Sequence, residues 1–196
     1  MRWLLTLVCV AAAAALVSAA PQRGPRVTTA ATCAAELGVG ASTGRRFCDV
    51  LIASSADQSI AIRIPAHRGT AKLLFDLHNR IAASPEDRPS PQTFVSNTAI
   101  VAVLGPRGEI GRGAAASEFR RPADLFDRIG GGADGGPKIV APGPATPVVM
   151  TIPAGISSVG IVGVRLEVLT RLGKQAYDTP GRPIAIASEV RVEYTR

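Results

Sequence analysis

The chain has 196 residues, of which 46% are hydrophobic and 19% are charged, and its formal net charge is +7. This length and apolar content suit a single domain with a substantial core, and no period of about 20–50 residues recurs, which excludes a repeat array. The basic residues are almost all arginine, no basic run exceeds two residues, and no aromatic residues alternate with them. We therefore expect a solvated basic surface and no nucleic-acid partner, although an anionic envelope polymer also fits the charge.

The first twenty residues predict a cleavable secretory signal peptide. Arg2 is a short basic start, residues 3–16 form an apolar run, and the small residues at 17–20 suit signal peptidase, with the cut expected after Ala19. The run is too short for a membrane anchor and no second long run follows, so no transmembrane segment is expected in the mature chain. We expect a bacterial protein exported to the periplasm or beyond, with a net charge of +6 (the +7 of the chain less Arg2).

Two cysteines remain in the exported chain, Cys33 and Cys48. In an oxidising compartment such a pair predicts a disulfide, which would stabilise the fold by about 3 kcal/mol. One cysteine pair and two scattered histidines supply too few ligands for zinc, and no metal or cofactor is predicted. The expected organisation is a signal peptide at 1–19, an N-terminal arm and disulfide-tied segment at 20–46, and a single β domain at 47–196.

The first part of this domain has the pattern of strands. Residues 47–53 form one predicted strand, and alternating apolar residues at 60–64 and at 71–83 flank a break at 65–69. Alternation on both sides of a break bounded by proline and glycine predicts a β-hairpin with both apolar rows on one face. The leucines at 71–83 also fall at helical spacings, so a helix is the alternative there.

A second hairpin is predicted further along the chain. Gln92–Leu104 is a long apolar strand, Gly105–Gly108 is a strong turn, and Glu109–Phe119 is the returning strand. Glycine and alanine dominate the returning strand, which leaves room for bulky neighbours or for the close approach of another layer. The proline-rich polar segment Pro85–Pro91 precedes this hairpin and is expected to be an exposed loop.

The last third contains one predicted helix and further strands. Pro122–Ile129 has proline at the first helical position and an apolar stripe, and Gly130 ends it. Strands are expected at 138–141, 147–152, 158–169 and 184–194. The last of these alternates so regularly that we expect one face to carry Ile184, Ile186, Ser188, Val190, Val192 and Tyr194.

About nine short strands and one short helix predict a mainly β fold, an antiparallel β-sandwich. The strands do not alternate with long helices, which argues against a parallel α/β sheet. Residues 146–169 resemble the secreted immunoglobulin-like and jelly-roll modules in general pattern, a likeness of fold that implies no function.

Asp76 and His78 are the candidate catalytic pair. They stand two residues apart on the outward face of the predicted strand, where a carboxylate can orient an imidazole base as it does in hydrolases. His67 lies in the preceding turn, about 25 Å or more from His78 along an extended strand, so the two histidines are not expected to share a metal. Residues 155–160 lack the Gly-x-Ser-x-Gly spacing of a nucleophile elbow, and Asp134 alone cannot form a calcium loop.

Tyr177 and Arg182 are the candidate binding residues. Most other aromatic residues stand in apolar stripes that the core needs, whereas Tyr177 lies in the predicted loop Gly173–Arg182 and is free to contact a ligand. Together these patterns predict a non-catalytic exported module that binds a protein partner or an envelope polymer through its exposed loops. A hydrolase that uses Asp76 and His78 and a carbohydrate-binding module that uses Tyr177 are the alternatives.

Overall fold

The computed structural model describes residues 25–29, 31–55, 58–82, 94–118, 125–129, 140–170 and 172–195. The predicted signal peptide at 1–19, the predicted loop at Pro85–Pro91 and Asp134 lie outside these residues.

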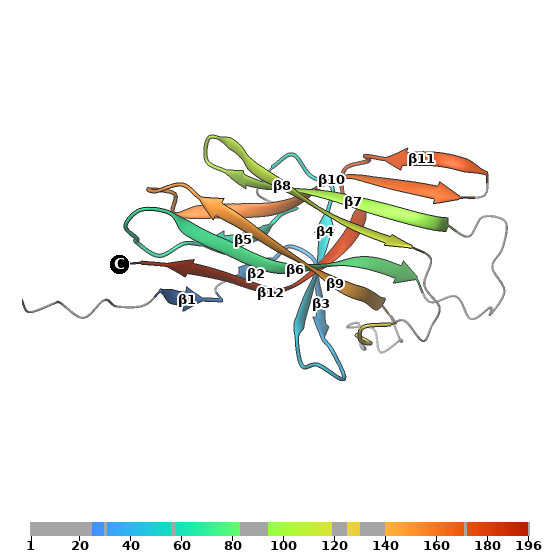
Figure 1. The fold of residues 1–196 in the computed structure, drawn as a ribbon, viewed down its shortest axis with the longest axis horizontal. Coiled ribbons are helices and arrows are strands. Elements are labelled where there is room, and N and C mark those ends of the chain that lie inside the picture. The colour runs from blue at the N-terminus through green and yellow to red at the C-terminus, as the bar shows by residue number, and fades with distance from the viewer. Residues whose placement is uncertain are drawn as a thin grey trace, which may run out of the picture.

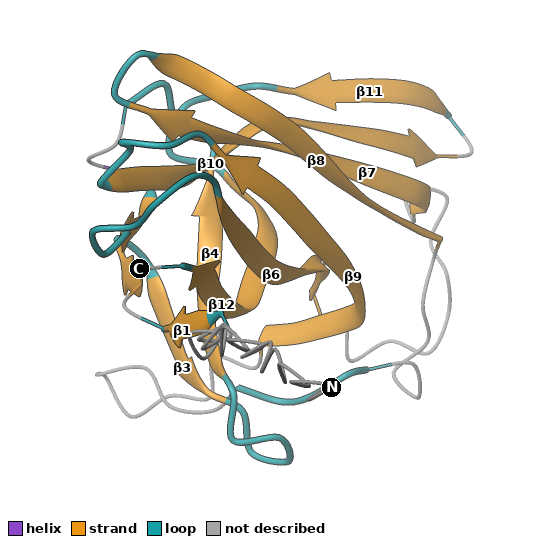
Figure 2. Ribbon diagram, turned by 60° about the vertical axis from the view of Figure 1, so that its left-hand side comes forward, coloured by secondary structure: helices purple, strands orange, loops and turns teal. Residues whose placement is uncertain are grey.

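The described residues form a β-sandwich of two antiparallel sheets, as the sequence predicts (Figure 1). The first sheet has the order β3 (Glu36–Val39), β4 (Arg46–Leu51), β12 (Pro183–Tyr194), β6 (Ala71–Ala82), β9 (Val140–Ile152), and β1 (Arg26–Thr28) also pairs with β12. The second sheet has the order β2 (Ala31–Cys33), β5 (Ile60–Arg63), β10 (Ser158–Thr170), β7 (Phe94–Gly105), β8 (Gly108–Glu118), and β11 (Gly173–Tyr177) also pairs with β10. Figure 2 shows the two layers crossing over a shared interior.

The core fills the space between the two sheets. Inward-pointing residues of the long strands fill it, and most of them are buried because both layers need an apolar inner face. The largest of the inward residues come from both sheets: Ile60, Ile62, Leu73, Phe75, Leu77, Ile152, Ile161 and Ile184. Residues 26–28 and 31–33, which belong to the predicted N-terminal arm and disulfide-tied segment at 20–46, are paired strands of this sandwich.

The hairpin predicted from residues 60–64 and 71–83 is wrong, although both segments are strands. β5 pairs with β2 and β10 in the second sheet, whereas β6 pairs with β12 and β9 in the first. The break between them therefore carries the chain from one sheet to the other. Alternation requires only that each apolar row faces the core, and two strands that face each other across the core satisfy this requirement as well as a hairpin does.

The second predicted hairpin is confirmed. β7 and β8 pair from Ser96↔Glu118 to Gly105↔Gly108 around the two turn residues. The small residues of β8 have the role that the sequence suggested, because a β-carbon on Gly113 would lie 3.1 Å from Val148 Cγ1 and one on Gly111 would lie 3.5 Å from Met150 Sδ. These glycines allow β9, at the edge of the other sheet, to close this side of the sandwich.

Two expectations for the last third are corrected. Residues 125–129 of the predicted helix Pro122–Ile129 are not helical, and residues 122–124 lie outside the described part of the chain. The segments 140–141 and 147–152 belong to one continuous strand, β9. β9 is the edge strand of its sheet, where prolines, which have no backbone N–H to donate, are tolerated.

β12 also differs from its predicted single face. Ile186 packs in a cluster outside the first sheet, while Val192 and Tyr194 face the core. Ile184 also faces the core, and the pairing with β4 is irregular between Pro183 and Ala185, before Ile186. The row returns to the core at a second irregularity, in the pairing with β6 between Ser188 and Arg191, where Glu189 has a φ of 52°. A bulge adds one residue to a strand and thereby reverses the face that later residues occupy.

Candidate functional site

His78 lies on the outer face of the first sheet, but it is buried. Its side chain is 0% exposed, because a second apolar cluster covers this face. We call this cluster the outer cluster; it contains Phe47, Ile129 and Ile186, with Leu37 and Phe126 packed against it. The ring centroids of Phe126 and Phe47 lie 4.9 and 5.7 Å from that of His78. His78 therefore lies on the outward face of the strand, as expected, but this face is covered by other side chains.

Both ring nitrogens of His78 are hydrogen-bonded inside the protein. Nδ1 lies 2.8 Å from the carbonyl oxygen of Gly143, and Nε2 lies 2.8 Å from Ser188 Oγ. Burial lowers the pKa of His78, and this effect exceeds the opposing effects of the Gly143 bond and Asp76. The ring is therefore neutral at pH 7. Since a carbonyl can only accept, Nδ1 carries the proton, and Nε2 accepts the hydroxyl proton of Ser188.

Asp76 does not bond to His78. Its Oδ2 lies 2.8 Å from Arg45 Nη1, and Arg45 Nε lies 3.6 Å from Glu189 Oε1. The same guanidinium lies 5.2 Å from the ring centroid of Phe126. The carboxylate of the predicted pair therefore holds an arginine at the edge of the outer cluster, and a backbone carbonyl, that of Gly143, orients the imidazole.

The short segment 125–129 covers His78, and we call it the strap. Its backbone is held by bonds from Ala41 N to Arg128 O (2.9 Å) and from Phe126 N to Pro142 O (2.8 Å). Asp127 anchors the strap to the β3–β4 turn, because its carboxylate accepts hydrogen bonds from Ser42 N, from Thr43 N and from the Thr43 hydroxyl. Burial favours a higher pKa for Asp127, but these bonds and one from Arg128 N outweigh it and lower the pKa to about 2.

Two further polar residues of the first sheet are buried near His78. Asp49 is buried and its Oδ1 lies 2.9 Å from Arg80 Nε; burial raises the pKa of Asp49, and Arg80 opposes the shift. Asn79 is 2% exposed, and neither the oxygen nor the nitrogen of its amide has a hydrogen-bond partner among the described residues. The amide lies against Gly143, where a β-carbon would overlap it, so Gly143 is required as glycine at this point of β9.

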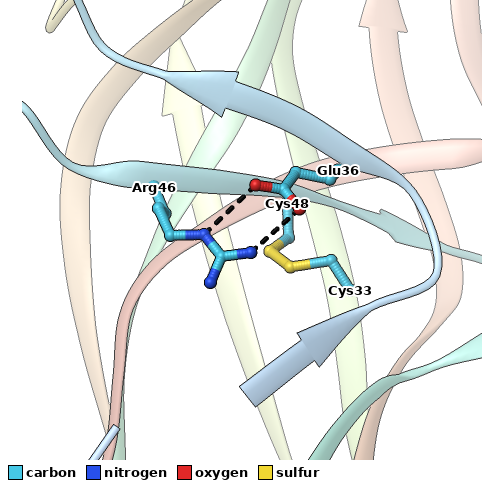
Figure 3. The surroundings of a disulfide bond; sticks show 4 residues. All are labelled: Cys33, Glu36, Arg46 and Cys48. Atoms are coloured by element: carbon cyan, nitrogen blue, oxygen red, sulfur yellow. Dashed lines mark hydrogen bonds and ion pairs between the residues drawn. A yellow bond between two sulfur atoms is a disulfide. The ribbon is translucent and has the colours of Figure 1, made fainter. Parts of the chain in front are cut away.

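The predicted disulfide between Cys33 and Cys48 is present and joins β2 of the second sheet to β4 of the first. Figure 3 shows Arg46 and Glu36 beside it, with Arg46 Nε and Nη2 lying 3.1 and 2.9 Å from the two oxygens of Glu36. A cavity of about 210 Å³ opens at this position. Both cysteines line it, together with Arg46, residues 189–191 of β12, and Thr29 and Ala31.

Tyr177 and Arg182, the predicted binding residues, lie together. Tyr177 is the last residue of β11, and the Arg182 guanidinium carbon lies 3.9 Å from the centroid of its ring. The phenol hydroxyl donates to Gln175 Oε1. Arg182 thus occupies one face of the ring that the sequence left free, and the two side chains form a preorganised stack.

Ser188, Gly143 and Arg45 are the site residues that the sequence reasoning missed. Gly143 and Ser188 are 65 and 110 residues from His78 in the chain, and no spacing signals such partners. His67 lies apart from the cluster, with its Nδ1 2.9 Å from Pro65 O in its own loop. Within the described ranges, no group of three or more His, Cys, Asp or Glu is placed to hold a metal ion.

Among the described residues, none of the helices has the length and apolar character needed to cross a membrane. Comparison with known proteins adds no relative, because no protein-family model and no curated protein matches this chain.

Proposed function

We propose that this chain is a non-catalytic exported module that binds a protein partner through the β10–β11 ribbon and the Tyr177–Arg182 stack. The observation that carries the proposal is that this stack is preformed at an open sheet edge. β11 pairs only with β10 in the described structure, so its second edge offers unpaired backbone groups to an incoming strand. Export is supported by the disulfide, since such bonds persist in oxidising compartments.

The chemistry of the ribbon favours a protein over a polysaccharide. Tyrosine and arginine are enriched at protein interfaces, and a stacked pair loses little side-chain entropy on binding. The ribbon also exposes two apolar side chains near its tip, Leu172 (74% exposed) and Leu169 (44%). It lies at the end of the molecule away from the C-terminus (Figure 1), so a partner can reach it without crossing the body of the sandwich. Arg182 covers one face of the Tyr177 ring, which leaves only the other face for stacking against a sugar.

The test is cross-linked affinity capture from the native cell envelope, carried out in parallel with variants. We expect Tyr177→Ala and Leu172→Lys to reduce recovery of the captured protein by about tenfold or more, the loss typical of an interface anchor. Arg107→Ala, in the exposed β7–β8 turn, and Val149→Lys, on the edge strand β9, are the matched controls and should retain it. Equal recovery with the ribbon variants and the controls would reject this surface.

A hydrolase is the second candidate, and one observation favours it. Ser188 Oγ donates to the unprotonated Nε2 of His78 over 2.8 Å, which is the arrangement of a nucleophile and its general base. Against it, Ser188 is 1% exposed and His78 is 0% exposed, so a substrate would reach the serine only if the strap moved away.

A serine-reactive fluorophosphonate probe tests this second candidate directly. A hydrolase predicts labelling of the wild-type protein that is lost in Ser188→Ala and reduced in His78→Gln, while a circular dichroism spectrum shows that both variants are folded. Absence of labelling in the folded wild-type protein, together with no turnover of a panel of esters, would leave the Ser188–His78 pair with a structural role.

A further inference from the structure

The first sheet has a gap along β12. On one side of β12, pairing with β4 ends at Ser188↔Phe47 and pairing with β1 begins only at Val192↔Thr28, so residues 189–191 have no partner on this side in the described structure. The N-terminal segment crosses here from β1 of the first sheet to β2 of the second. The cavity of about 210 Å³ lies at this gap.

The backbone beside the cavity holds a conformation that side chains rarely adopt. Glu189 has a φ of 52°, the only positive φ at a non-glycine residue in the described chain. Such a conformation costs about 1–3 kcal/mol and persists only where the surrounding structure imposes it, often at ligand sites. In this chain it forms the bulge that places Val190 and Arg191 beside the cavity.

Among the described residues, the charged groups that line the cavity include one cation, Arg191, with no ion pair. Arg46 is neutralised by its two bonds to Glu36, and Glu189 lies 3.6 Å from Arg45, which it shares with Asp76. Arg191 lines the cavity, is half-buried, and forms no ion pair or side-chain hydrogen bond within the described part of the chain. A partly desolvated guanidinium binds a carboxylate more strongly than a fully solvated one does.

The remaining lining is apolar or weakly polar, and the cavity is small. Val190 and the Cys33–Cys48 disulfide provide apolar surface next to the charge. Ligand pockets for drug-sized molecules begin at about 300 Å³, so this volume fits an amino-acid-sized group. We propose that the cavity binds a small monocarboxylate with a short aliphatic body, with Arg191 as the counter-ion. The carboxylate belongs either to a free organic acid or to the C-terminal residue of a peptide.

Backbone amide NMR titration of the oxidised protein tests the proposal with 4-methylpentanoate and its neutral amide, 4-methylpentanamide. A ligand of this size is expected to bind with a Kd of about 1 mM. The carboxylate should shift the signals of residues 189–191 and of Cys33, and the amide should not. Arg191→Gln should weaken binding by about tenfold or more, because a charge-assisted bond is lost. Arg107→Gln, an exposed arginine in the β7–β8 turn, is the matched control and should bind normally.

A second variant keeps the test decisive if Arg191→Gln disturbs the fold. Ala31→Leu retains Arg191 but fills the cavity, and it should also abolish the shifts.

A second titration, with N-acetyl-Ala-Leu that has a free or an amidated C-terminus, distinguishes the two sources of the carboxylate. If the free form of the peptide binds more tightly than 4-methylpentanoate, the ligand is a chain end. Weaker or equal binding identifies a free acid. Equal binding of acid and amide, normal binding by Arg191→Gln, shifts confined to other regions, or no shift at all would overturn the proposal. These outcomes are independent of binding at the β10–β11 ribbon.

Discussion

At the scale of single residues, His78 shows how burial changes the meaning of a polar side chain. An aspartate and a histidine two residues apart on one strand face suggest an acid–base pair, yet here each forms hydrogen bonds to other residues. Asp76 bonds to Arg45, and His78 bonds to Gly143 and Ser188. Because both nitrogens of the buried ring are satisfied, the ring stabilises the packing of the outer cluster as long as it remains neutral.

His78 should make the stability of the protein depend on pH. Its pKa is lowered from 6.5 in the folded state, chiefly by burial, so the unfolded chain binds this proton at a higher pH than the folded chain does. The stabilisation is therefore complete above pH 6.5 and is lost as the pH falls from there toward the folded pKa. We expect urea midpoints to fall between pH 7.5 and pH 5.5, with a slope of at most about 1.4 kcal/mol per pH unit from this residue.

The matched variants are His78→Gln, which removes the titrating group, and His67→Gln, which removes the other histidine. His78→Gln should have a lower stability at pH 7.5 and a flatter dependence on pH, while His67→Gln should follow the wild-type curve. A wild-type slope that persists unchanged in His78→Gln would show that another group is responsible.

At the scale of elements, the strap is held in place mainly by one carboxylate, that of Asp127. Five residues without regular structure cannot hold themselves over a sheet, and Asp127 supplies the attachment by accepting from two backbone N–H groups and a hydroxyl of the β3–β4 turn. Gly40 must be glycine here, because a β-carbon would overlap the carboxylate and lie 2.7 Å from Phe47 Cε2.

Asp127→Asn should destabilise the protein by about 1–3 kcal/mol, although the two side chains have the same shape. The amide nitrogen of asparagine would face a donor that the second carboxylate oxygen now accepts, so one buried group loses its partner. Urea denaturation at pH 7 measures the loss, and Asp178→Asn, in an exposed position, is the matched control and should stay within about 0.5 kcal/mol of wild type.

Since the folded pKa of Asp127 is about 2, the stabilisation that Asp127 provides is present above pH 3.8 and disappears as the pH falls toward 2.

Some features of the strands could be predicted from the sequence and others could not. The β7–β8 hairpin was predictable because its turn and both strands are contiguous, and so were the core-facing rows of β5 and β6. The sheet to which β5 belongs was not predictable, because its partners β2 and β10 are specified by packing across the core. The bulge at Glu189 was also not predictable. The even-numbered residues of β12 are largely apolar on both sides of the bulge, so the sequence pattern gives no sign that the face they occupy changes. The outer cluster was not predicted, because no sequence pattern indicated that the strap, which was expected to be part of a helix, packs on the outward face of β6.

At the scale of the whole molecule, the disulfide closes the side of the sandwich that the strands leave least secured. β1, β2 and β3 have three, three and four residues, and within the described part of the chain each pairs with a single other strand. Cys33 lies in β2 and Cys48 in β4, so the bond ties one sheet to the other next to the gap in β12. The opposite side is closed by the long strands β8 and β9, which need no covalent bond.

Removal of the disulfide should therefore weaken the whole fold and the cavity together. The bonded residues are 15 apart in the chain, and closing a loop of this length stabilises a fold by about 3 kcal/mol. We expect the double variant Cys33→Ser/Cys48→Ser, or reduction of the wild-type protein, to lower the free energy of unfolding by about that amount in urea, since both linked strands belong to one cooperative sandwich. The double variant is the control for the reduction experiment, because reductant should leave its free energy of unfolding unchanged. If reduction instead lowered the wild-type stability by less than about 0.5 kcal/mol, β2 would be held by its pairing with β5 alone.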